Sequence, residues 1–256
     1  MTRDDSRQTH QVTQQVLECL ARSRVYKVLS QALGPPDLAI LKGSVRSEAV
    51  EDLARMTRLL SPEIIKVTLE FAQTLENAQL DAENIRRDYE HSFSESGSAH
   101  IPLYETEYTS PHVFAKTQMM ADIAGFYRAF GMRSNHRLGE RPDHASAELE
   151  FMHLLTLMEA NASSEENEYR VEVCLDARRK FVEDHIGRWL LPMGTAVAQV
   201  ADTNLYKTLG KLLTVFLEDE KRRLGAKPQE VSIRVQRPPF DQKEDRVCGL
   251  GEASHR

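Results

Sequence analysis

The sequence predicts an all-α protein, a single-domain helical bundle, and three observations support this prediction. Apolar residues recur at intervals of three and four along most of the chain, as on one face of a helix. Ser-Pro pairs at 61–62 and 110–111 are typical helix starts. No run of residues alternates polar and apolar side chains as a half-buried strand would. The 256 residues suffice for one large core.

The expected helices follow one another with short breaks. The first two cover about 10–33 and 45–59. A third runs through "SPEIIKVTLEFAQTLENAQ", with Ser61 as N-cap and Pro62 at the first helical position. Further helices are expected at about 82–93, 111–131, 143–161, 164–187 and 203–224. No long linker separates them, so residues 1–226 are predicted to form one domain, with an extended or disordered tail at 227–256.

The helix expected at 111–131 carries apolar residues all round its circumference. Such a pattern favours a central helix that other elements cover on several sides. The residues concerned are Val113, Phe114, Met119, Met120, Ile123, Phe126 and Phe130.

Charge and cysteine content exclude several classes of protein. The net charge is −6 and the pI is about 5.9, so no nucleic-acid partner is expected. Cys19, Cys174 and Cys248 lie far apart, without the spacing of a zinc site or a disulfide framework. The polar N-terminus lacks a secretory signal, and no segment is apolar enough to insert into a membrane. We therefore expect a cytoplasmic protein.

The segment "GERPDHASAELEFMHLLTLMEAN" at 139–161 places two polar residues in an apolar helical stripe. His144 and Glu148 precede Phe151, Met152 and Leu155 on one face. Burial of such groups without hydrogen bonds costs roughly 2–7 kcal/mol each. The pair therefore indicates either a satisfied internal network or a binding site. Directly before it, Asp143 is expected to cap the helix.

A metal site is the main alternative for these residues. His144 and Glu148 could bind a divalent ion together with a third ligand, which would make the chain a small helical metal-binding protein or enzyme. Glu150 and His153 form the E-x-x-H element of di-iron bundles, but the second copy falls in the tail at 252–255. Both lie away from the apolar stripe, on a face expected to be solvated. No metal, cofactor or catalytic residue is predicted.

Two basic runs and the single tryptophan have simple structural interpretations. "DARRK" at 176–180 and "DEKRR" at 219–223 mix both signs of charge and are expected on solvated helix faces. Trp189 is expected to be a core residue.

Three segments resemble the signatures of one protein family. "IPLYETEY" at 101–108, "DIAGFYRAFGM" at 122–132 and "ERPDHASAELEFM" at 140–152 are similar, in order and spacing, to motifs of the TorD-type chaperones, a family that includes DmsD and NarJ-like proteins. The resemblance extends over about residues 15–222. It implies an all-α fold and a chaperone of molybdenum-cofactor oxidoreductases rather than an enzyme.

The resemblance also implies a partner and a set of binding residues. The partner is the apo catalytic subunit of a molybdopterin oxidoreductase, bound directly or through its twin-arginine signal peptide, before cofactor insertion and export. Periplasmic dehydrogenases or oxyanion reductases of the dimethyl sulfoxide reductase group are the expected clients. The residues that match the motifs and are expected to bind the client are Tyr104, Glu105, Tyr108, Asp122, Tyr127, Arg141, Asp143, His144, Glu148, Phe151 and Met152.

Two further possibilities stay open at this point. The chain could be a permanent structural subunit of a redox complex instead of a transient chaperone. A monomer is expected by default, and a dimer is possible within the family's fold.

Overall fold

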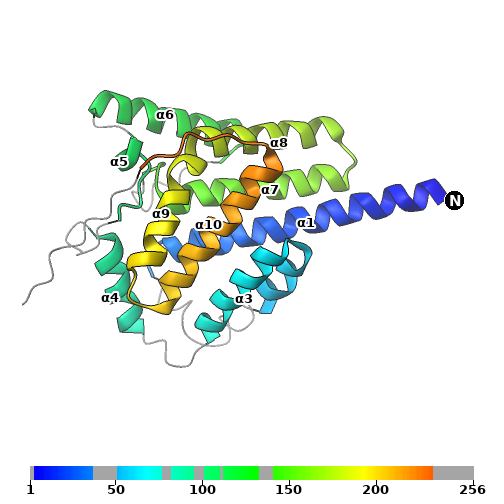
Figure 1. Ribbon diagram of the computed structural model, residues 1–256. Coiled ribbons are helices and arrows are strands. Elements are labelled where there is room, and N and C mark those ends of the chain that lie inside the picture. Colours follow the sequence, from blue (N-terminus) through cyan, green and yellow to red (C-terminus); the bar gives the residue numbers. More distant parts are fainter. Residues whose placement is uncertain are drawn as a thin grey trace, which may run out of the picture.

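The computed structural model describes residues 3–36, 51–76, 82–94, 101–109, 112–132 and 141–232. Within these ranges every element of regular secondary structure is a helix (Figure 1), and the only β-type pairing is an isolated bridge between Tyr104 and His144. The predicted all-α class is therefore confirmed. The helices are α1 (Arg3–Leu33), η1 (Thr57–Leu59), α3 (Pro62–Glu76), α4 (Ala82–Phe93), α5 (Thr106–Thr109), α6 (Val113–Ala129), α7 (Ala145–Ser164), α8 (Glu168–Phe181), the π-helical turn η3 (Val182–Ile186), α9 (Gly187–Val200) and α10 (Asn204–Leu224).

The bundle is organised around two helix pairs. α1 runs alongside α7, and α9 packs against α10 (Figure 1). α8 lies against α7, and α3 against α10. The α9–α10 crossing is close: a Cβ atom on Gly210 would lie 2.5 Å from the carbonyl oxygen of Gly194. Both positions therefore need glycine for steric reasons.

The predicted helix starts agree with the structure at one of the two Ser-Pro pairs. α3 begins at Pro62, directly after Ser61, as expected. The helix expected from Ser110 and Pro111 begins at Val113, with His112 as its N-cap. Ser110 and Pro111 themselves lie outside the described residues.

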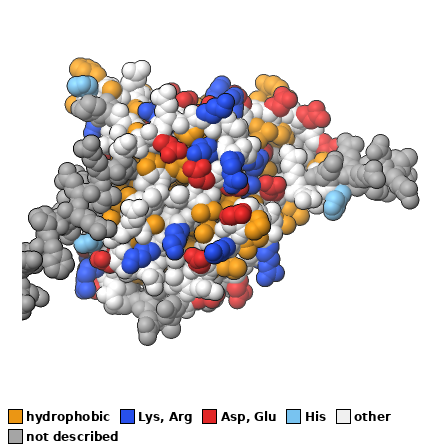
Figure 2. Space-filling model, viewed as in Figure 1, with side chains coloured by type: hydrophobic (Ala, Val, Ile, Leu, Met, Phe, Trp, Pro, Cys, Tyr) orange, Lys and Arg blue, Asp and Glu red, His pale blue; other side chains and the backbone are white. Residues whose placement is uncertain are grey.

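α6 is a peripheral helix, which corrects the prediction of a central one. Of its residues only Ile123 and Tyr127 are fully buried. Val113 and Phe114, in its first turn, are 76% and 91% exposed. Figure 2 shows exposed hydrophobic side chains at this end of the molecule, and further hydrophobic side chains interspersed with both signs of charge over the rest of the visible face. The apolar circumference of α6 therefore reflects uncovered surface and not burial on all sides.

α9 was absent from the expected helices because Pro192 lies inside it. Proline has no N–H group, so it cannot donate to the carbonyl of residue 188, one turn earlier. In the structure this carbonyl of Arg188 accepts instead from the backbone N–H of Val231, at 2.9 Å. The chain after α10 is thereby attached to α9, and the helix passes through the proline. Residues 227–232 are extended here, and the remainder of the predicted tail lies outside the described residues.

The two basic runs are not entirely solvated, because Arg178 is fully buried. Its guanidinium donates to the carboxylates of Glu159 on α7 and Glu220 on α10. Arg22 on α1 contacts Glu220 from the other side at 2.6 Å. Burial opposes ionisation of Glu220, but the charges of Arg178 and Arg22 outweigh it and lower the pKa of this carboxyl to about 2. We name these four residues the buried ion cluster. It joins α1, α7, α8 and α10.

The face of α7 expected to be solvated contacts α1. Glu150 accepts two hydrogen bonds from Lys27, each at 2.8 Å, and a longer one from the hydroxyl of Ser30 at 3.4 Å. His153 Nδ1 lies 2.7 Å from the hydroxyl of Ser23. The prediction that this face is solvated was wrong, because α7 packs against α1 as well as against α8. The surface of α1 that faces α7 is itself polar there, at Ser23 and Lys27.

Removal of the central cation tests the buried ion cluster. We expect Arg178→Met to lower the free energy of unfolding by about 3–5 kcal/mol, since two buried carboxylates lose a partner. Urea titration at neutral pH measures this change. Arg179→Met is the matched control, because Arg179 is exposed and its pair with Asp176 is at the surface. Equal losses of unfolding free energy in the two variants would contradict a stabilising role of Arg178 in the buried ion cluster.

Candidate functional site

The three motif segments converge in space. The chain at 101–108 pairs with the chain at 141–145 through two backbone hydrogen bonds, Glu105 N–H to Asp143 C=O at 2.9 Å and Ala145 N–H to Leu103 C=O at 2.8 Å. From the third segment, the hydroxyl of Tyr127 donates to the carbonyl of Pro142 at 2.8 Å. Residues that are up to 42 positions apart therefore form one structural unit, which we name the motif unit.

Asp143 does not cap α7, and this prediction was wrong. The N-cap is His144, whose Nδ1 accepts from the backbone N–H of Ser146 at 3.1 Å. Asp143 is buried and points the other way, where its carboxylate accepts from the hydroxyl of Thr106 at 2.8 Å and from Arg141 at 2.7 Å. Asp143 therefore fixes the start of α5 to residues 141–144, which we name the motif loop.

A surface hollow lies beside this junction. Arg141 extends across the ring of Tyr104, with its guanidinium carbon 4.4 Å from the ring centre. The hollow has a volume of about 220 Å³ and both aromatic and charged walls. We name it the Tyr104 hollow. Its lining residues are Tyr89, Glu90, Phe93, Ser94, Pro102, Leu103, Tyr104, Glu107, Arg141 and His144.

Beneath the motif unit lies a buried pair of acids. Glu148 accepts a hydrogen bond from the indole N–H of Trp189 at 3.0 Å, and Glu105 lies 3.0 Å from His185 Nδ1. All four side chains are buried. Burial, and then the neighbouring charge of Glu105, raise the pKa of Glu148 well above its usual range. Glu148 therefore holds a proton that an exposed glutamate would release.

His185 connects this buried pair to the surface. Its Nε2 atom lies 3.4 Å from a carboxylate oxygen of Asp122 on α6, whose side chain is 64% exposed. Sequence reasoning missed His185 and the partnership of Trp189 with Glu148, because neither His185 nor Trp189 lies in a motif segment. It also missed Thr106, which lies within the segment at 101–108 but is not one of the residues matched to the family motif. The one available signal was that Glu148 needed a buried hydrogen-bond donor.

The predicted site residues divide into two groups by exposure. Asp122 and Arg141 reach the surface, and Tyr104 and Tyr108 are partly buried. A second group is buried, and of its members His144 alone lines the Tyr104 hollow. The role of this group as a contact surface stays a prediction. Its members are Glu105, Tyr127, Asp143, His144, Glu148, Phe151 and Met152.

The structure bears on the metal-binding alternative from the sequence. In the described ranges no group of three His, Cys, Asp or Glu side chains is placed to hold a metal ion. His144 instead caps α7, and Glu148 accepts from Trp189. Among the helices searched, none combines the length and the apolar character that crossing a membrane requires.

Comparison with known proteins gives the family. Residues 57–193 match the family described as nitrate reductase delta subunit. This span exceeds half of the 256 residues and contains all three motif segments. The chain belongs to this family. The predicted resemblance to the TorD-type chaperones is thereby confirmed.

Curated members of the nitrate reductase delta subunit family and its relatives give the functional class. The chain is 28% identical over 213 residues to the perchlorate reductase assembly chaperone protein of Dechloromonas aromatica (strain RCB), which covers 81% of this chain and 91% of the relative. It is 28% identical over 134 residues to the chlorate reductase assembly chaperone protein of Ideonella dechloratans, 52% of this chain and 66% of the relative. It is 24% identical over 168 residues to the chaperone protein TorD of Vibrio cholerae, 65% of this chain and 74% of the relative.

All three relatives are named as chaperones, which confirms the predicted chaperone class and does not favour the metal-binding alternative. Perchlorate and chlorate are oxyanions, so two of the names agree with the expected group of oxyanion reductases.

The raised pKa of Glu148 predicts how stability depends on pH. Above the ordinary carboxyl value of 4.5, the folded chain keeps a proton that the unfolded chain has lost, so stability falls as pH rises. Glu148→Gln should remove up to about 1.4 kcal/mol per pH unit from this slope. Unfolding by urea at several pH values measures it.

Glu150→Gln provides the control, because Glu150 lies two residues further on in α7 but is only partly buried, and pairs with Lys27 of α1. An identical pH slope in wild type and Glu148→Gln would contradict the protonated state of Glu148.

Proposed function

We propose that this protein is a cytoplasmic chaperone, without turnover of its own, that binds the apo catalytic subunit of a molybdenum oxyanion reductase. It recognises the subunit's twin-arginine signal peptide and retains the subunit until the molybdopterin cofactor is inserted and export follows. The observation that carries the proposal is that one family match contains all three motifs, which fold into one unit beside the Tyr104 hollow.

The chemistry of the Tyr104 hollow supports this ligand. Glu90 and Glu107 line its wall, and Tyr89 and Phe93 present aromatic rings. Both carboxylates form ion pairs, Glu90 with Arg86 at 2.6 Å and Glu107 with Lys116 at 3.0 Å, which a client guanidinium would replace. Guanidinium groups form charge-assisted hydrogen bonds with carboxylates and stack on aromatic faces, as Arg141 already does on Tyr104. A peptide with two arginines fits such walls.

The buried residues of the motif unit serve a different purpose in this proposal. Asp143 joins Arg141 to the start of α5, and Glu148 joins α7 to Trp189. These bonds hold Tyr104 and Arg141 in place, so that the surface is formed before the client arrives. Cytoplasmic location follows from the proposed action before export.

Co-purification tests the proposed function. The catalytic subunit encoded beside this protein, expressed without molybdenum cofactor, should co-purify with the chaperone, and deletion of its twin-arginine segment should weaken the complex. Unchanged binding after the deletion would overturn signal-peptide recognition. Normal reductase activity in cells that lack this protein would overturn the chaperone function itself.

The carboxylates of the hollow give a residue-level prediction. The double variant Glu90→Gln and Glu107→Gln should weaken binding of a synthetic twin-arginine peptide about tenfold or more, since hydrogen bonds to charged groups contribute about 1.5–3 kcal/mol each. Calorimetric titration measures the affinity. Glu165→Gln is the control, because Glu165 forms a similar exposed pair with Arg170 outside the hollow. Equal affinity for the double variant and the wild type would exclude the hollow as the arginine site.

A further inference from the structure

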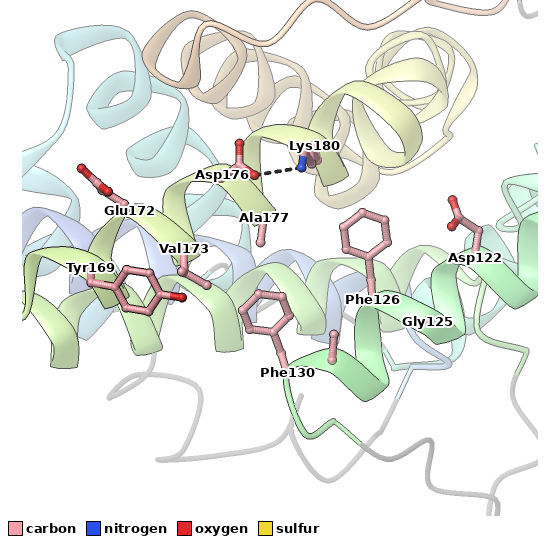
Figure 3. Close-up of a pocket in the computed structure, with 11 residues that line it drawn as sticks. Asp122, Gly125, Phe126, Phe130, Tyr169, Glu172, Val173, Asp176, Ala177 and Lys180 are labelled. Carbon is pink, nitrogen blue, oxygen red and sulfur yellow. Dashed lines mark ion pairs between the residues drawn. The ribbon is translucent and has the colours of Figure 1, made fainter.

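We infer that a groove between α6 and α8, separate from the Tyr104 hollow, is a second client-binding surface that takes an amphipathic helix bearing lysine or arginine. The inference rests on the proposed function. The groove has a volume of about 550 Å³ and is open to the surface. In Figure 3, Phe126 and Phe130 project from α6 and Val173 and Tyr169 from α8 toward the space between the two helices.

The apolar surface of this groove is uncovered. Tyr169 is 75% exposed, and its ring lies beside Val173, which is exposed as well. Phe126 contacts the core with one edge, where its ring centre is 5.3 Å from that of Phe181, and lines the groove as well. Aromatic residues that are anchored in a core on one side and open on the other are typical of binding surfaces.

Gly125 is an independent indication that another backbone approaches here. It lies within α6 and has no left-handed backbone angle, so its conformation does not require glycine. A Cβ atom built on it would have nothing within 4 Å, so packing inside the chain does not require glycine either. Glycine weakens a helix relative to alanine. A partner helix that packs closely on α6 at Gly125 and Ala129, one turn apart, accounts for the small residues.

Charge defines the chemistry of the partner. Asp122, Glu172 and Asp176 line the groove, and Lys180 is the cation among its lining residues, paired with Asp176 at 2.9 Å (Figure 3). Asp176 is also paired with Arg179, so the acidic character of the rim comes from Asp122 and Glu172. A second copy of this chain carries a net charge of −6 and matches the rim poorly. A client segment with an apolar face and basic flanks is complementary in both respects.

Site-specific photocrosslinking tests the inference. The chaperone with p-benzoylphenylalanine in place of Tyr169 is irradiated in complex with the apo catalytic subunit, and the adduct is mapped by mass spectrometry. The expected result is an adduct with one client segment that has an apolar helical face and lysine or arginine beside it. The same group in place of Gln118, an exposed residue of α6 outside the groove, is the control and should give no such adduct.

Blocking the groove provides the second measurement. Gly125→Leu should lower the adduct yield about tenfold, because added bulk in a packed contact costs binding free energy. Its melting temperature should equal or exceed that of wild type, since the new side chain meets open space. Gln118→Leu, with the same added side chain, should leave the yield unchanged.

The outcomes separate this inference from the proposed function. If wild type binds the apo subunit but Tyr169 gives no client adduct, an adduct with a second copy, or an adduct with an acidic segment, the groove is excluded and the chaperone function stands. An adduct yield that Gly125→Leu does not reduce also excludes the groove. If wild type does not bind the apo subunit at all, the proposed function fails first.

Discussion

The relative positions of four helices depend on the buried ion cluster. Arg178 on α8 bonds to Glu159 on α7 and Glu220 on α10, and Arg22 approaches Glu220 from α1. Burial of four charges is favourable only where each finds its partner, so the cluster fixes the relative positions of four helices as well as holding them together. An apolar core of the same volume would tolerate small shifts that these bonds do not.

This fixed arrangement carries the functional surfaces. α7 begins at the motif loop and contributes Glu148, which accepts from Trp189 on α9. Because α7 is held by the ion cluster toward its other end, the loop that bears Arg141 starts from a defined position. The Tyr104 hollow and the α6–α8 groove share no lining residue, and Asp122 of the groove contacts the buried His185 beneath the motif unit.

Local patterns predicted the helical class, the start of α3 at Pro62 and the burial of Trp189, because each is determined by neighbouring residues. Features determined by distant partners were not predictable in this way. The burial of Arg178 requires two carboxylates from other helices, and the cap of α7 passes to His144 because Thr106 and Arg141 engage Asp143. An apolar circumference did not distinguish a central helix from the peripheral α6, since the sequence of either shows apolar residues on several sides.

The bond between Val231 and Arg188 has a practical consequence for the end of the chain. It is made by main-chain atoms, and proline at position 231 is the one substitution that removes the donor. The side chain of Val231 also packs against the core. Protein ended at Ala226 would lose both contacts, whereas a label or fusion partner joined after residue 232 would retain the attachment to α9.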